Sequence, residues 1–243
     1  MNRPRTLGRA IAATLIAAAT AMTVVASAGP TVADDTSTDD ALATLKVRVT
    51  HRIDLRLATL ARLDRRVDRA EHLAGDHRDT LSSLIDDEVA ALTELRAQVA
   101  EASTRDELRA DVESMVTDHR IFILVLPKIR LTLVADRELA VVARLGQVHD
   151  KLAERIDRAE AAGRDTGRAA ELLDAMQAQL DAAAAEVNGQ VDRLLAIEPG
   201  PDRPALRSAL DEVRESLRAA RQDLRDAIGI ARRIRALLRQ SAT

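Results

Sequence analysis

The residues of this chain best suited to chemistry are five histidines, four of which are next to an acidic residue in the sequence. His72 and His77 flank Gly75-Asp76, and Glu71 precedes them. Imidazole and carboxylate groups can together hold a divalent metal ion. The spacing matches no strong metal motif, however, and residues of these types also occur as caps at helix ends. The sequence therefore predicts no metal site and no cofactor.

Other catalytic chemistry has equally little support in the sequence. The acidic runs Asp39-Asp40 and Asp86-Asp87-Glu88 lack the glycine-containing loop of a calcium site, and we interpret them as solvated faces. No cysteine is present, and no P-loop, dinucleotide-binding or nucleophile-elbow motif occurs. We therefore expect a non-enzymatic protein with no catalytic residues. A Ser, His and Asp triad assembled only by folding is the remaining enzymatic alternative.

The C-terminal segment is the first candidate interaction surface. Four arginines and no acid follow Asp226, and these are Arg232, Arg233, Arg235 and Arg239. Positive charge near a helix C-terminus is favourable because it opposes the helix dipole, and this alone can account for them. The functional alternative is docking to an anionic cell-surface polymer or to lipid headgroups.

A central apolar segment, residues 121–134, is the second candidate surface. It is apolar on every helical face, so we expect neighbouring helices to enclose it. Pro127 has no N–H and predicts a kink. Two alternatives stay open, namely a strand over residues 128–134 and a patch that dips into a membrane or self-associates. The residues that this segment offers for interaction are Ile121, Phe122, Leu126 and Pro127.

The sequence around this segment contains a recognisable combination of motifs. His119-Arg120 precedes the apolar residues, Leu126-Pro127-Lys128-Ile129 and Ala135-Asp136-Arg137 follow, and Ala219–Arg225 lies near the C-terminus. This combination resembles the signature of a family of exported, all-helical bacterial proteins with no assigned activity. That signature usually begins with tyrosine, whereas this chain has His119, which we expect to be a hydrogen-bonded core residue. The resemblance implies export and a helical fold and supplies no catalytic residues.

The N-terminus has the three parts of a secretory signal peptide. Three arginines precede an uncharged apolar stretch that ends in Ala26-Ser27-Ala28. We expect cleavage after Ala28, with cleavage after Ala33 as the alternative, and an uncleaved membrane anchor also stays open. No later apolar run approaches the roughly 20 residues of a membrane span. We therefore expect a secreted protein that works in the cell envelope.

Composition argues against several kinds of partner. The chain has 36 basic and 39 acidic residues, so loss of the three N-terminal arginines would take its net charge from −3 to about −6. General nucleic-acid binding needs a basic surplus, and we expect no nucleic-acid partner. The chain also has one phenylalanine and no tryptophan or tyrosine, the rings on which bases and many partners pack.

Helix-forming residues dominate from residue 41 onward, after a predicted disordered lead-in at 29–40. Glycine, proline and capping residues interrupt them at four places. Five helices are therefore predicted, at 41–74, 78–102, 105–162, 166–197 and 204–240. The last has an apolar seam spaced by fours and threes from Leu206 to Leu238, which requires a partner helix along its length.

Two parts of the sequence are repeated. The motif Arg66–Glu71 returns as Arg155–Glu160, and the seam that begins at Leu108 returns from Leu206. We predict an all-α fold, an elongated antiparallel helical bundle or coiled coil of two duplicated three-helix units. The units are residues 41–130 and 131–243, and they share a long central helix kinked near Pro127. The plan is similar to spectrin-type repeats in architecture, without their tryptophan; a single five-helix bundle is the alternative.

We interpret the duplicated motif as a repeated helix-packing motif without a specific function of its own, since Val67 and Ile156 fall on the predicted seams. The sequence thus favours an exported, non-enzymatic scaffold or interaction protein that contacts an unknown protein or envelope component. The alternative is a periplasm-type chaperone or sensor-like binder that uses residues 121–134. Binding of an anionic polymer or membrane surface through the C-terminal arginines is a third hypothesis. A homo-oligomer also stays open because the seams can close within one chain or between chains.

Overall fold

The computed structural model describes residues 35–199 and 202–240. The predicted signal peptide, both of its cleavage sites and residues 29–34 of the predicted lead-in lie outside the described residues. Within them the chain is all-helical and has no strand, which confirms the all-α class. Residues 128–134 are helical, so the strand alternative is wrong. No described helix is both long enough and apolar enough to cross a membrane.

Five of the described helices are longer than 20 residues. They are α1 (Asp35–Asp68), α2 (Gly75–Glu101), α4 (Leu126–Ala161), α5 (Gly167–Val187) and α7 (Arg203–Gln240). Three shorter elements connect them: α3 (Arg105–Thr117), the π-helical turn η1 (Ile121–Val125) and α6 (Gln190–Leu195).

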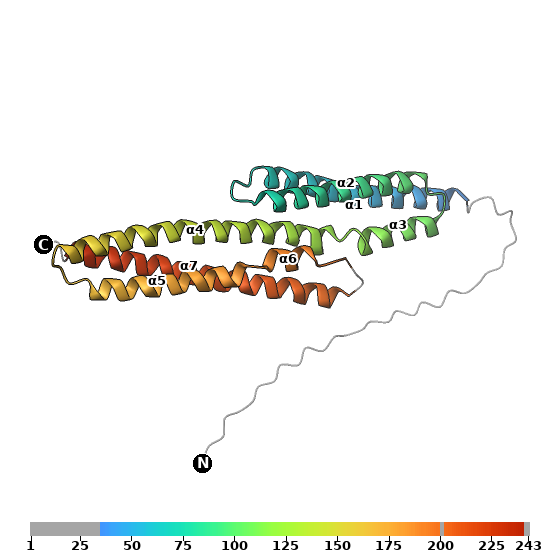
Figure 1. Ribbon diagram of the computed structural model, residues 1–243. Coiled ribbons are helices and arrows are strands. Elements are labelled where there is room, and N and C mark those ends of the chain that lie inside the picture. Colours follow the sequence, from blue (N-terminus) through green and yellow to red (C-terminus); the bar gives the residue numbers. More distant parts are fainter. Residues whose placement is uncertain (1–34, 200–201, 241–243) are drawn as a thin grey trace, which may run out of the picture.

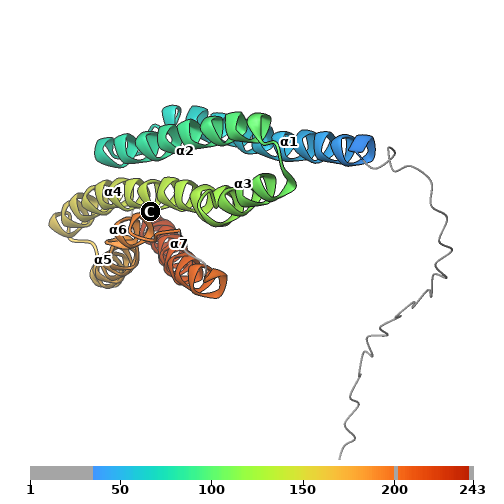
Figure 2. The ribbon, with the colours of Figure 1, turned by 90° about the vertical axis from the view of Figure 1, so that its right-hand side faces the viewer.

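Helix α4 lies at the centre of the molecule. The α1–α2 hairpin lies on one side of it and α5 with α7 lies on the other, as two perpendicular views show (Figure 1 and Figure 2). Two hydrophobic clusters follow this arrangement. One joins α1, α2 and α3 to the start of α4, and the other joins α4 to α5 and α7. Leu195 packs against both clusters.

The buried face of α7 accounts for its length of 38 residues. A helix this long needs packing along its whole seam, because local helix propensity alone is marginal in water. The seam residues predicted from the sequence are buried up to Ile234: Leu206, Leu210, Val213, Leu217, Ala220, Leu224, Ala227, Ala231 and Ile234. Ala183 of α5 lies in the same cluster with no exposed surface, and small residues of this kind let helix axes approach closely.

The chain departs from the single helix predicted over residues 105–162. Helix α3 ends at Thr117, and η1 separates it from α4. In η1 the amides of Val125 and Leu126 bond to carbonyls five residues earlier, on Arg120 and Ile121. Pro127 therefore lies in the first turn of α4, where its missing N–H needs no partner. The break thus precedes the proline, because the chain restarts its helix there instead of bending over the ring.

Two further element boundaries differ from the prediction. Helix α1 begins at Asp35, so residues 35–40 of the predicted disordered lead-in are helical. The apolar period that set the predicted start locates only the turns that pack on neighbours. The helix predicted over 166–197 is also divided, since α5 ends at Val187 and Gly189 adopts a φ of 75°. A left-handed residue of this kind ends a helix, and glycine adopts it without strain.

One buried carboxylate fixes the turn between α1 and α2 to α4. Asp136 of α4 is 4% exposed; it accepts a hydrogen bond from the amide of Ala74 at 2.8 Å and lies 2.9 Å from Nδ1 of His77. Helix α2 has no side-chain cap of its own, so Asp136 satisfies an amide at its N-terminus from another helix. Arg78 donates to the carbonyls of Val67 and Ala70 at the end of α1. The last turns of α1 are thereby held beside α4.

Candidate anion-binding groove

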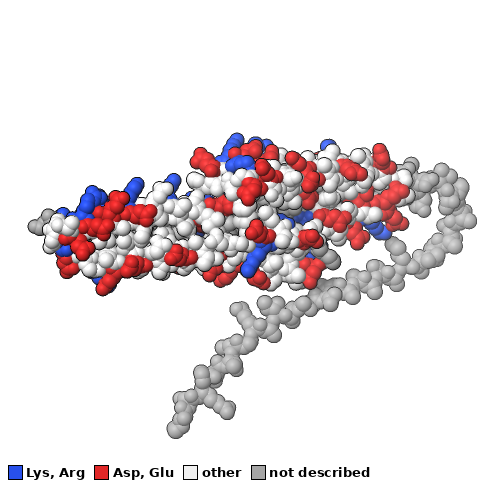
Figure 3. Space-filling view, viewed as in Figure 1, with Lys and Arg blue, Asp and Glu red and all other residues white. Residues whose placement is uncertain are grey.

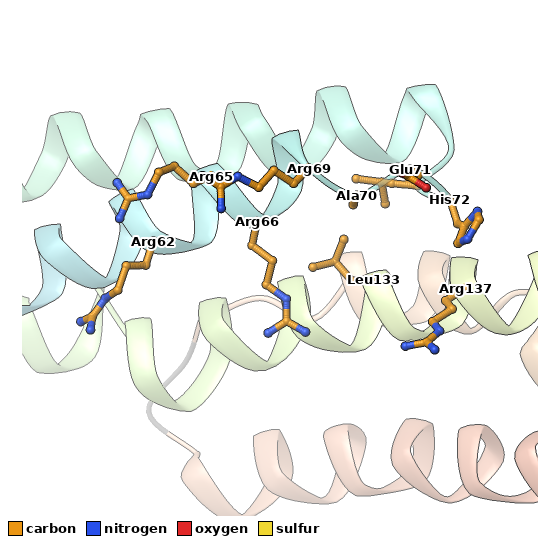
Figure 4. Close-up of a pocket in the computed structure, with 10 residues that line it drawn as sticks. Arg62, Arg65, Arg66, Arg69, Ala70, Glu71, His72, Leu133 and Arg137 are labelled. Carbon is orange, nitrogen blue, oxygen red and sulfur yellow. The ribbon is translucent and has the colours of Figure 1, made fainter.

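A groove lined by five arginines lies between the end of α1 and the first half of α4. Its volume is about 390 Å³. The arginines are Arg62, Arg65 and Arg66 from α1, Arg69 from the turn that follows α1, and Arg137 from α4. Figure 4 shows Leu133 of α4 between Arg66 and Arg137. Ala70, Glu71, His72 and Leu73 complete the lining. We call this site the first groove.

The last turns of α1 and the turn that follows it place Arg62, Arg65, Arg66 and Arg69 near one another. Their spacing is i, i+3, i+4 and i+7, which keeps them on neighbouring turns of one side of the helix. The apolar face between their stems is anchored in the core, since Leu63 is 4% exposed and Val67 is fully buried. The arginines therefore lie at the edge of the packed surface, where all four are exposed.

Clustered like charges are unfavourable unless something compensates them. Each such pair at these helical spacings costs about 0.2–0.5 kcal/mol. The helix dipole compensates Arg65 and Arg66, which lie in the last turn of α1. It does not compensate Arg62, one turn earlier, or Arg137, which lies well inside α4. A bound anion would compensate all five.

The ion pairs of the described residues reinforce this point. None of the five arginines lies within 4.0 Å of a carboxylate among these residues. Arginines elsewhere on the surface do, at the short helical spacings of Arg168–Glu171, Arg214–Asp211 and Arg218–Glu215. Among the described residues, Arg62 is the one of the five whose side chain makes hydrogen bonds, to the carbonyl of Ala58 and to Oγ1 of Thr59. The first groove thus concentrates five positive charges, with one acid, Glu71, in its lining.

The chemistry that this groove supports is recognition of an oxyanion. A guanidinium group is planar, stays charged, and presents paired donors that match phosphate, sulfate or carboxylate oxygens. The lining contains no serine, threonine, cysteine or lysine. Glu71 is the one acid in the lining and His72 the one histidine.

The predicted apolar site is largely enclosed. Ile121 is 1% exposed, while Leu126 and Pro127 are half-buried. Phe122 is the exception, since 48% of it is exposed. The guanidinium carbon of Arg56 lies 5.4 Å from the centre of the Phe122 ring, a cation–π contact that joins η1 to α1. Burial, and to a lesser extent the charge of Arg52, lowers the pKa of Arg56.

The predicted C-terminal arginines divide into two groups. Arg232 and Arg233 are exposed and line no groove among the described residues. Arg235 and Arg239 face α4, where they line grooves together with Arg155 and Arg158. The structure thus brings half of the predicted tail together with basic residues far away in the sequence.

The histidines considered as ligands make pairs with single carboxylates. Nδ1 of His119 lies 3.0 Å from Oε2 of Glu88, at a half-buried position on α2. His77 pairs with Asp136, and His72 lies in the first groove. No group of three or more histidines, aspartates or glutamates is placed to hold a metal among the described residues.

Comparisons with known proteins add no assignment to this geometry. No family model matches the chain, and no curated protein or solved structure does so.

Sequence reasoning missed the first groove, although one signal for it was present. The i, i+3, i+4, i+7 spacing of arginines in residues 62–69 marks a basic stripe on a helix. The interpretation of Arg66–Glu71 as a helix-packing motif concerned Val67, which is buried. The charged residues of the motif gain meaning only when Leu133 and Arg137 of α4 lie opposite them, and this depends on the tertiary fold.

Proposed function

We propose that this protein is an exported, non-enzymatic helical interaction protein of the cell envelope that binds phosphate groups of an anionic partner in the first groove. The observation that carries the proposal is the convergence of five arginines, unpaired with any described carboxylate, on one groove of about 390 Å³. Phosphate is favoured over a single carboxylate because it can accept from several guanidinium groups at once.

The finer architecture and the location belong to the same proposal. Two duplicated three-helix units in an elongated antiparallel coiled coil would present the groove at the junction of the units. Export is supported by the basic, apolar and small-residue parts of residues 1–28 and by the resemblance of residues 119–137 to a family of exported helical proteins. In that compartment, phosphate-rich polymers and lipid headgroups are both accessible.

The chaperone alternative has less support from the packing. It needs an accessible apolar surface at residues 121–134, whereas Leu124, Val125 and Ile129 are each 3% exposed or less. Phe122 is the one large apolar side chain that is exposed in this described segment. Binding of clients by this segment would require η1 and the start of α4 to separate from α1 and α2.

The proposal is tested by titrating the purified protein with tripolyphosphate in a calorimeter. We expect binding that weakens with added salt, because exposed charge interactions are screened. Arg66→Gln with Arg137→Gln should weaken binding by at least 10-fold, since a hydrogen bond to a charged group contributes about 1.5–3 kcal/mol. Vesicles of phosphatidylglycerol serve as a parallel ligand, so that binding to one and not the other identifies the source of the phosphate.

The matched control removes the same charge from exposed arginines that have partners. Arg109→Gln with Arg168→Gln affects side chains that are 81% and 72% exposed and paired with Asp106 and Glu171. We expect the control to bind as the wild type does. Equal weakening in both variants would show a general charge effect, and absence of binding to either ligand at low salt would overturn the proposal.

A further inference from the structure

A second basic groove lies between the end of α4 and the end of α7. Two adjoining hollows of about 340 and 360 Å³ form it, and both contain Arg155, Arg158 and Arg235. Lys151 and Glu154 complete the charged lining of one hollow, and Arg164 and Arg239 that of the other. We call this site the second groove.

The internal repeat relates the two grooves position by position. Lys151, Arg155 and Arg158 of α4 each follow a first-groove arginine by 89 positions, namely Arg62, Arg66 and Arg69. On the facing helix the repeat offset is the one that relates the Leu108 seam to the Leu206 seam. That offset of 98 positions takes Arg137 to Arg235. Four basic positions of the first groove are thus basic in the second.

Burial of the motif is the same in both copies. Val67 is fully buried and Ile156 is 4% exposed, so each copy inserts its apolar residue into a core and leaves its two arginines at the edge. The arginines of both copies then face a basic residue of a neighbouring helix, Arg137 or Arg235. Packing alone requires the apolar residue and does not require this third charge.

The two grooves open from the same side of α4. Arg137 and Arg155 are 18 residues apart in this one helix, which is five complete turns at 3.6 residues per turn. Their side chains therefore leave α4 in the same direction, about 27 Å apart at a rise of 1.5 Å per residue. Basic side chains, with acidic ones among them, lie along the upper edge of the space-filling view over the left-hand part of α4 (Figure 3).

We propose that the duplicated motif builds two equivalent phosphate-binding grooves, and that one extended phosphate polymer occupies both along α4. This inference rests on the proposed function and deepens it by naming the ligand as a linear polyanion. A flexible chain is favoured over a lipid surface because both sites are hollows between helices, which a flat bilayer would span without entering. Acidic residues among the arginines also oppose close contact with a uniformly negative surface.

The grooves are expected to differ in strength. Glu154 occupies the position that corresponds to Arg65, and its carboxylate lies 3.9 Å from the guanidinium of Arg158. The second groove therefore carries a partly neutralised charge and should bind the same probe more weakly. Arg164 and Arg239 extend it on the far side of this pair.

Two probes distinguish two sites from one. Tripolyphosphate is short, so calorimetry should count two molecules per wild-type chain and one in either groove variant. The variants are Arg66→Gln with Arg137→Gln and Arg155→Gln with Arg235→Gln. Long-chain polyphosphate should lose about 10²–10⁴-fold in affinity when either groove is disabled, because linkage of two sites multiplies their effect. Arg214→Gln with Arg218→Gln, a pair on α7 that lines neither groove, should match wild type.

Each other outcome has a defined meaning. The wild type could bind one tripolyphosphate per chain, and Arg155→Gln with Arg235→Gln could bind it equally well. This result would overturn the second groove and leave the proposed function intact. Two sites without a loss of polymer affinity in the single-groove variants would overturn the shared polymer. Binding to phosphatidylglycerol vesicles alone would also overturn it. No binding of any probe would overturn the proposed function itself. Thermal melts of each variant confirm that it is folded.

Discussion

Lys128 is one of four charged side chains that are buried among the described residues. It is 7% exposed, and its ammonium donates a hydrogen bond to the carbonyl of Leu195 at the end of α6, 2.9 Å away. Burial lowers its pKa from the ordinary 10.5, and the charge of Glu198 opposes this shift to a lesser extent. The carbonyl end of a helix is a favourable place for a cation, which explains why the site is tolerated.

The lowered pKa of Lys128 predicts how stability changes with alkaline pH. Below the folded-state pKa both states carry the proton, and the folded state bears the full cost of the buried charge. Between that pKa and 10.5 the unfolded chain binds more protons, so the free energy of unfolding should rise with pH. Lys128→Met should remove this rise. Urea unfolding between pH 8 and 10.5 measures it, and few other groups titrate there because the chain lacks tyrosine and cysteine.

The matched control is Lys46→Met. Lys46 also donates to a helix carbonyl, that of Ala100 at 2.9 Å, from a less buried position. Lys46→Met thus removes a lysine hydrogen bond of the same kind and leaves the buried charge of Lys128 in place. A wild-type pH slope that survives in Lys128→Met would contradict the assignment.

At single residues, sequence reasoning located burial better than charge. Val67 and Ile156 were predicted to lie on buried seams and do so, because an apolar period reports directly on the packed face. His119 was expected to be a hydrogen-bonded core residue; it is half-buried and pairs with Glu88. That partner lies 31 positions away on another helix, and no local pattern identifies it. The arginines of the first groove were missed for the same reason.

At the scale of the elements, local signals predicted helix ends well where the capping groups are local. Thr104 and Glu107 have the spacing of a capping box at the start of α3, and both of its hydrogen bonds are present. The amides of Ser103 and Thr104 lower the pKa of Glu107 by bonding to its carboxylate. The N-terminus of α2 could not be explained in this way, because the acceptor for Ala74 comes from α4.

The contacts of Asp136 with the N-terminus of α2 should contribute strongly to the attachment of the α1–α2 hairpin to α4. Asp136→Ala removes a buried acceptor and leaves the amide of Ala74 and Nδ1 of His77 without it. We expect the free energy of unfolding to fall by about 1–3 kcal/mol, the cost of an unsatisfied buried group. Urea unfolding at pH 7 measures this loss.

Asp150→Ala provides the comparison for this variant. Asp150 pairs with His149 at 3.2 Å, but its side chain is 76% exposed, so loss of the contact should change stability little. Equal free energies of unfolding for the two variants would show that Asp136 does not stabilise the attachment of the α1–α2 hairpin to α4.

At the scale of the whole molecule, α4 contributes residues to both hydrophobic clusters. Leu195 is the one residue of the described chain that packs against both. The first cluster takes Ile129 from its start, and the second takes Leu145, Leu152 and Ile156 from its later turns. The two units predicted from the repeats stay a prediction, which the two separate clusters support. The sequence could not indicate that Leu195 packs against both clusters.

Separate clusters predict that each unit can open without the other. Leu60 of α1 and Met176 of α5 have no exposed surface and lie in the first and second cluster, respectively. Truncation of either to alanine should cost about 2–5 kcal/mol locally. Hydrogen exchange should then speed up in α1 and α2 for Leu60→Ala and in α5 and α7 for Met176→Ala, because local opening governs exchange. Uniform acceleration over all helices in both variants would instead show a single cooperative bundle, in which the two grooves could not respond independently to a polymer.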